Sequence, residues 1–204
     1  MTNTTAHPRV RQVRAAAELA ASALAAVGPD RWSAPTPCRD YDLRTLVDHL
    51  AWAAVLSRHA AVREPLEHDW STPAPPPFIA GLPETAWAAP LAVELRRAAE
   101  AWAAPEAWEG ETVMAATPMP SGVVGPMMLA EFALHGWDVA RAVGAPYDVP
   151  DAVAQATLVA VEGMAAMGRE GGWYGPEVPV AADAPAFDRA LGLSGRDPGW
   201  TAPA

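Results

Sequence analysis

The chain has no lysine, so all 14 of its lysine-or-arginine positions are arginines. This absence excludes Schiff-base chemistry and general-base catalysis by a lysine amine. Cysteine is nearly absent as well, because Cys38 is the single one in 204 residues. One cysteine excludes an internal disulfide and any zinc site that needs two or more thiolates from one chain. So little cysteine is consistent with a reducing compartment, and we expect a cytoplasmic protein.

Positive charge is also scarce, since the formal net charge is −10. This balance argues against nucleic acid as a partner, because neutralising phosphates requires a basic patch. It argues equally against binding to anionic membranes, and no apolar run reaches the roughly 20 residues that a membrane-spanning helix needs. Three N-terminal arginines before an alanine-rich stretch imitate a signal peptide, but Glu18 interrupts that stretch, so we expect an amphipathic helix. The expected partner is a small-molecule substrate, and a homodimer stays open.

Alanine and proline together outline the organisation of the chain. Alanine-rich periodic stretches favour helices, and the 22 prolines are concentrated between these stretches. Residues 1–8 are expected to form a disordered lead, followed by a single domain with a C-terminal extension over 9–204. The expected helices cover 10–27, 43–63, 90–103, a segment from either 121 or 126 to 144, 151–167 and 185–193.

Two long connections, 64–83 and 105–120, separate these expected helices. Because the first is too long for a tight hairpin, the second and third helices need not be antiparallel neighbours. A short extended piece is expected within 109–114, but no segment has the convincing period-two alternation of a strand. The pattern favours an all-α fold, a four-helix bundle with long crossover connections and short additional C-terminal helices. Facing helices of such bundles build metal sites in the core.

Glu131 and His135 are the most informative pair of residues. They lie four residues apart in AEFALHGWDVARAVG (130–144), a stretch without proline that is predicted to be helical, so both side chains share one face. That face is largely apolar, and a carboxylate directed into a core is costly unless it is paired or bound to a metal. Carboxylate and imidazole at this spacing can hold one metal ion. A buried salt bridge between the two side chains explains the pattern equally well.

His49 is a candidate third member of this site, at the edge of the apolar stripe of the helix expected over 43–63. Together with Glu131 and His135 it would make a site of two imidazoles and one carboxylate. Three protein ligands leave a fourth position open, which is the pattern of catalytic zinc. On spacing alone, a hydrogen-bonded core histidine is the more common role.

Four further side chains each have alternative roles. Asp138 can orient His135 from behind, serve as a fourth ligand, or pair with Arg141 as an exposed acid. Cys38 is expected to be a packed thiol rather than a ligand or nucleophile. Arg196 can close the tail onto the bundle through a carboxylate, or reach an anionic substrate. Trp52, near His49 in sequence, can line the pocket, although we expect it to pack in the core.

Three segments in order resemble one family. They are TPCRDYDLRTLVDHL (36–50), LHGWDVARAVG (134–144) with a glutamate before it, and FDRALGLSGRDP (187–198). They resemble the metal-binding, DinB-like domain found at the N-terminus of mycothiol-dependent maleylpyruvate isomerases, and the last segment resembles a single-domain branch with a GRDP-type tail. Tyr41 stands where that family usually has tryptophan. The resemblance implies a DinB-like bundle and a divalent metal, zinc or alternatively nickel, held by His49, Glu131 and His135.

The resemblance also implies an activity. We expect an enzyme that uses a thiol of the mycothiol type on a small electrophilic substrate, as an S-transferase or an isomerase. The same cavity could instead serve a metal-dependent hydrolase or a specialised biosynthetic enzyme. A non-catalytic metal-binding or interaction domain is the other alternative. A fourth protein ligand such as Asp138 would favour that structural role.

Overall fold

The computed structural model describes residues 7–68 and 74–203. Within them the fold is all-α, as the sequence predicted, and its one sheet has two strands. The helices are α1 (Pro8–Ala25), α2 (Leu43–Val62), η1 (Glu84–Ala86), α3 (Ala88–Ala101), η2 (Pro105–Trp108), α4 (Ser121–Val143), α5 (Asp151–Glu170) and α6 (Ala186–Leu193), and the strands are β1 (Glu111–Met114) and β2 (Thr117–Pro120).

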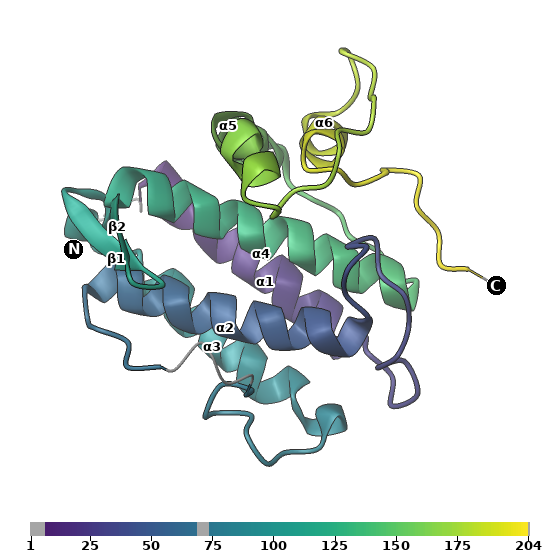
Figure 1. The fold of residues 1–204 in the computed structure, drawn as a ribbon, viewed down its shortest axis with the longest axis horizontal. Helices are drawn as coiled ribbons and strands as arrows, with labels where there is room; N and C mark the ends of the chain where they lie inside the picture. Colours follow the sequence, from purple (N-terminus) through teal and green to yellow (C-terminus); the bar gives the residue numbers. More distant parts are fainter. Residues whose placement is uncertain (1–6, 69–73, 204) are drawn as a thin grey trace, which may run out of the picture.

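The four helices α1 to α4 form a bundle in which α1 and α2 lie at opposite corners (Figure 1). Each of these two helices packs against both α3 and α4. Ion pairs fix the directions: Arg14 meets Glu100 and Arg96 meets Glu18, so α1 and α3 are antiparallel.

The helices α2 and α3 are neighbours that run in the same direction. Arg44 near the start of α2 pairs with Glu84 just before α3, and Arg58 further along α2 pairs with Glu94. The prediction that these two helices need not be antiparallel is thus confirmed. In contrast, α4 begins beside the end of α2, because β1 lies there and the Thr112 hydroxyl donates to the Ala60 carbonyl at 2.6 Å. The helices α2 and α4 are therefore antiparallel neighbours.

Local signals explain where the two helices of the site begin and end. The Asp42 carboxylate caps α2 by accepting from the Thr45 amide at 2.8 Å. The helix ends at Arg63, which adopts a left-handed conformation. Gly144 ends α4 in the same conformation, with φ of 73°, where a glycine carries no steric penalty. Both ends agree with the sequence prediction.

Several predicted bounds were wrong by a few residues. The helix α1 begins at Pro8, capped by His7, so these two residues do not belong to the expected disordered lead, and residues 1–6 lie outside the described part of the chain. The helix α3 begins at Ala88 rather than at Pro90. A proline in the first turn is tolerated because the amides there have no partner within the helix.

The sheet is a correction, because the sequence predicted an extended piece but no strand pairing. β1 and β2 form an antiparallel hairpin that pairs Glu111 with Pro120 and Met114 with Thr117. The turn between them places Ala115 at φ 46° and Ala116 at φ 72°. Hairpin turns with two positive φ angles normally carry asparagine and glycine. An Ala-Ala turn between four-residue strands therefore leaves no signal that sequence patterns can detect.

The C-terminal part covers one side of the bundle. The helix α5 packs against α4 and α6, and Figure 1 shows α5 and α6 together above α4. After α6 the tail turns at Gly195, whose φ is 84° and whose Cα would place a side chain 2.7 Å from the Gly175 Cα. Only glycine fits this close approach. The turn directs Arg196 back towards α4.

None of the helices in the described residues is long and apolar enough to cross a membrane.

Candidate metal centre

Two antiparallel helices bring the three predicted ligands together. His49 comes from α2, and Glu131 and His135 come from successive turns of α4. The Nε2 atom of His49 lies 2.6 Å from Glu131 Oε1, and the Nε2 atom of His135 lies 3.3 Å from the same oxygen. The donor atoms of the three residues all lie within 4.8 Å of one another. We refer to these residues as the His–Glu–His cluster.

The donor chemistry of this cluster suits a divalent transition metal. Two imidazole nitrogens and a carboxylate oxygen are ligands that zinc and nickel accept. Both rings direct Nε2 at the shared oxygen, and the two ring planes are inclined by 76° with centroids 4.9 Å apart. The residues present therefore fit the metal that the family resemblance implies.

Close approach of α1 and α4 is built into the sequence HGWD around His135. A Cβ atom on Gly136 would lie 2.5 Å from the Tyr147 Oη and 2.9 Å from the Ala20 Cα. A larger residue would push α4 away from α1 and shift His135. The neighbouring Trp137 is 3% exposed and packs in the interior.

The charges of the cluster are strongly coupled. Burial opposes the charged form of Glu131, but the charge and hydrogen bonds of His135 and His49 outweigh burial and hold the pKa of Glu131 well below its usual range. Burial likewise opposes the charged form of His135. The Glu131 charge and the hydrogen bonds to Asp138 and Glu131 outweigh it and raise the pKa of His135 to about 9. The metal-free cluster therefore holds a proton at neutral pH.

Asp138 lies behind His135, on the side away from Glu131. Its side chain is fully buried, and its Oδ2 atom lies 2.9 Å from the Nδ1 atom of His135. Of the three roles that the sequence left open for Asp138, the exposed acid paired with Arg141 is therefore wrong, and the contact with His135 from behind is the one present. Arg141 instead lies over the Trp137 ring and donates to the Pro198 carbonyl.

Arg196 supplies the charge that balances Asp138. The guanidinium donates from Nε to Oδ1 at 2.9 Å and from Nη2 to Oδ2 at 2.8 Å, a bidentate pair. Burial disfavours the charge of Asp138, but Arg196 and His135 outweigh this effect and lower the pKa of Asp138. Of the two roles that the sequence left open for Arg196, the structure shows carboxylate pairing.

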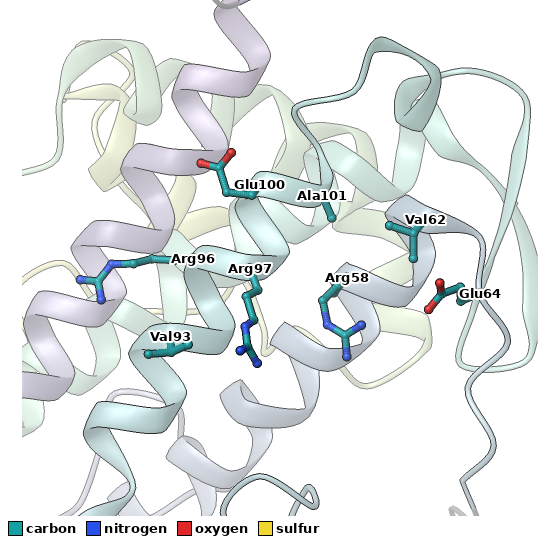
Figure 2. Close-up of a pocket in the computed structure, with 8 residues that line it drawn as sticks. All are labelled: Arg58, Val62, Glu64, Val93, Arg96, Arg97, Glu100 and Ala101. Carbon is teal, nitrogen blue, oxygen red and sulfur yellow. The ribbon is translucent and has the colours of Figure 1, made fainter.

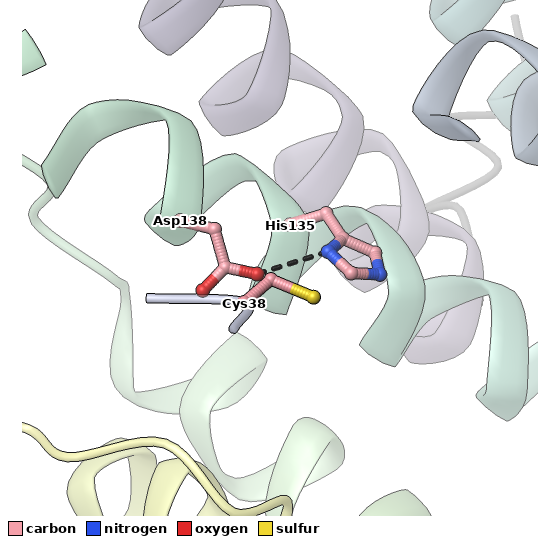
Figure 3. A group of neighbouring side chains, drawn as sticks. All are labelled: Cys38, His135 and Asp138. Atoms are coloured by element: carbon pink, nitrogen blue, oxygen red, sulfur yellow. Dashed lines mark hydrogen bonds and ion pairs between the residues drawn. The ribbon is translucent and has the colours of Figure 1, made fainter. Parts of the chain in front are cut away.

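Cys38 lies beside the Asp138–His135 hydrogen bond (Figure 3). Its sulfur belongs to a second group of close donor atoms, formed with His135 and Asp138. Burial, with a smaller contribution from the Asp138 charge, raises the pKa of the thiol to about 11. Since both Asp138 oxygens are already bonded to Arg196 and the thiol is neutral, this group is a poorer metal site than the His–Glu–His cluster. The expectation of a packed thiol agrees with this environment.

The aromatic side chains Tyr41 and Trp52 lie in different surroundings. The Tyr41 ring lies against His49, with centroids 5.3 Å apart. Trp52 is half-buried, and its Nε1 atom donates to the Ala74 carbonyl at 2.9 Å while its ring lies against His68. Trp52 therefore packs beneath the connection after α2 and not in the core, which corrects the sequence expectation.

A separate open groove of about 600 Å³ lies between α2 and α3 (Figure 2). Three arginines line it, but each is already close to a glutamate. Arg58 and Arg97 lie 2.6 Å and 3.6 Å from the Glu94 carboxylate, and Arg96 pairs with Glu18. The groove shares no residue with the His–Glu–His cluster.

A helical bundle whose facing helices bring two histidines and a glutamate together defines a class of candidate metal-binding proteins. The chain belongs to the mycothiol maleylpyruvate isomerase N-terminal domain family, because that family's profile matches residues 13–140. The match includes the His–Glu–His cluster and Asp138, and it ends before the C-terminal part that carries Arg196. Searches of the curated proteins and of the solved structures found no match.

Proposed function

We propose that the protein binds one divalent metal ion, zinc in the first place and nickel as the alternative, through His49, Glu131 and His135. The observation that carries this proposal is the convergence of their three donor atoms within 4.8 Å. Family membership supports it independently, because the matched region contains all three residues. The short contacts of Glu131 Oε1 with two Nε2 atoms describe the arrangement that the metal would replace.

The geometry favours a site with a position left open for substrate. In the described part of the chain this group of donors has three members. Asp138, the candidate fourth ligand, is engaged by Arg196 and by the Nδ1 atom of His135. A structural zinc site is normally closed by four protein ligands, whereas three ligands are the catalytic pattern.

We further propose that the protein is an enzyme that transfers a mycothiol-type thiol to a small electrophilic substrate, or isomerises such a substrate with the thiol's help. The metal would supply positive charge that lowers the pKa of a bound thiol. The chain's own residues hold this centre: Asp138 fixes the His135 ring, and Tyr41 packs against the ring of His49. The buried surroundings of His135 keep water from one side of the cluster.

Metal content tests the first proposal. Wild type and Glu131→Ala are purified without a nickel column, incubated with zinc, desalted and analysed by inductively coupled plasma mass spectrometry. We expect close to one zinc per wild-type chain and a loss of most of it in the variant. Glu162→Ala, which removes an exposed acid on α5, is the matched control and should retain the metal. Equal zinc in Glu131→Ala and wild type would contradict the assignment.

Thiol consumption tests the second proposal. Zinc-loaded protein is assayed with mycothiol and a panel of small electrophiles, with His49→Ala as the comparison. We expect thiol transfer above background in wild type only. Background rates in both proteins, with the zinc still bound to wild type, would refute the transferase. Zinc-dependent ester or amide hydrolysis would then assign the same site to a hydrolase.

A further inference from the structure

A chain of buried polar contacts joins the C-terminal tail to the His–Glu–His cluster. It runs from Arg196 through Asp138 to His135, and the exposed fractions of these side chains are 6%, 0% and 9%. Two residues 58 positions apart in the sequence thus form a bidentate pair directly behind His135. Burying two full charges is costly, so a stability role alone is a weak explanation for such a pair.

The contacts define which nitrogen of His135 carries the inner proton. A carboxylate only accepts, so the Nδ1 atom donates to Asp138 Oδ2 at 2.9 Å. The guanidinium of Arg196 also approaches Nδ1, at 3.3 Å, but it is a donor too and cannot bond to a protonated Nδ1. With the proton held on Nδ1, the lone pair needed by a metal lies on Nε2, which faces Glu131.

Arg196 in turn determines how Asp138 is oriented. Its Nε and Nη2 atoms hold both carboxylate oxygens, and its Nη1 atom donates to the Ser194 hydroxyl at 3.1 Å. The Ser194 hydroxyl, two residues before Arg196, therefore helps to hold the guanidinium in place. The turn at Gly195, together with a bond from the Arg196 amide to the Leu191 carbonyl at 2.8 Å, fixes the backbone after α6.

We infer that Arg196 is a positioning residue for the metal site: through Asp138 it holds His135 with its proton on Nδ1 and its Nε2 lone pair directed at the metal. The C-terminal segment 194–196 thereby sets the metal affinity of ligands carried by α2 and α4. This inference rests on the proposed function, because it assumes that the cluster holds a metal.

The experiment measures zinc dissociation constants of the full chain by competition with a chromophoric chelator. The variants are Arg196→Gln, Arg196→Lys and Asp138→Asn, and Arg189→Gln, another arginine of the C-terminal part, is the matched control. Loss of a hydrogen-bonded partner behind a ligand typically weakens metal binding 10- to 100-fold. We expect a weakening in this range for Asp138→Asn, about tenfold for Arg196→Gln, less for Arg196→Lys, and none for the control.

A second readout separates positioning from a merely structural role. Long-range ¹H–¹⁵N correlation spectra of the zinc-loaded protein report whether the Nδ1 atom of His135 is protonated. We expect a protonated Nδ1 and a metal-bound Nε2 in wild type, and a shifted or broadened Nδ1 signal in Arg196→Gln. A residue that only stabilises the fold would lower the free energy of unfolding and leave this signal and the zinc affinity of the folded protein unchanged.

The outcomes test the proposed metal binding and the role of Arg196 separately. No zinc on wild type overturns the proposed function and this inference with it. Zinc on wild type with equal affinity in Arg196→Gln and Asp138→Asn overturns the inference alone. If Arg196→Gln does not fold, the zinc affinities of Arg196→Lys and Asp138→Asn test the inference instead, because both variants preserve size and polarity at their positions.

Discussion

Removing the Asp138 carboxylate should lower the free energy of unfolding of the metal-free protein substantially. In Asp138→Ala the Arg196 guanidinium stays buried, 6% exposed, without the carboxylate that accepts from its Nε and Nη2 atoms. Breaking a buried ion pair by removing one partner typically costs about 3–5 kcal/mol. For a domain of this size that corresponds to a fall of roughly 10 °C in the melting temperature.

The origin of this cost is the unpaired charge, and a double variant isolates it. Asp138→Ala/Arg196→Met removes both charges and fills the guanidinium's place with an apolar chain. We expect the double variant to be more stable than Asp138→Ala alone, by about 1–3 kcal/mol, because no buried charge remains. The Asp138–His135 hydrogen bond is lost in both proteins, so it does not contribute to the difference.

The chain offers a matched surface pair as the control. Arg96 and Glu18 form a bidentate pair with distances of 2.7 and 2.9 Å, but their side chains are 51% and 54% exposed. Exposed pairs contribute about 0.2–1 kcal/mol, so Glu18→Ala should change stability by less than 1 kcal/mol. Urea denaturation with a chelator present, monitored by tryptophan fluorescence, measures all four proteins. Equal losses for Glu18→Ala and Asp138→Ala would refute the reasoning from burial.

Two further predictions concern protons. Glu131 and Asp138 raise the pKa of His135 to about 9, so zinc must displace a proton from Nε2 below that pH. The zinc affinity should therefore rise about tenfold per pH unit from pH 6 to 8 and level off near pH 9. A zinc affinity that does not change with pH in calorimetric titrations would contradict this. Burial raises the pKa of the Cys38 thiol to about 11. At pH 8 the metal-free folded protein should therefore react with an aromatic disulfide reagent on the order of a hundredfold more slowly than the urea-unfolded protein. Similar reaction rates in the two states would contradict the packed thiol.

The helical frame could be predicted from the sequence because its signals are local. The Asp42 cap, the Gly144 ending and the alanine-rich periodicity each act within a few residues, and the structure places helix boundaries where those signals lie. The hairpin could not be predicted, because its turn residues, Ala115 and Ala116, occupy conformations that alanine rarely adopts. Tertiary contacts with α2 and α4 hold the strands there, and such contacts leave no trace in a short window of sequence.

In the candidate site, too, the sequence predicted what depends on local spacing and missed what depends on tertiary contacts. The spacing of Glu131 and His135 predicted a shared face, because four residues make one helical turn, and the two side chains do meet. That His49 joins them depends on α2 and α4 being antiparallel neighbours, which spacing alone does not determine; the family resemblance supplied that expectation. Of the three roles that the sequence left open for Asp138, the contact with His135 is the one the structure has, whereas the cation that pairs with it could not be predicted, because Arg141 is near in sequence and Arg196 is near in space.

The position of Arg196 has a consequence for how the site is assembled. The family profile ends at residue 140, so the matched region contains the three donors and Asp138 but not the arginine that balances Asp138. Without a cation in that place, the charge of buried Asp138 would favour the protonated form of His135, which has no lone pair on Nε2 for a metal. Arg196 neutralises Asp138 and leaves the carboxylate free to act as a hydrogen-bond acceptor. The C-terminal part of this chain therefore contributes directly to the surroundings of the candidate site.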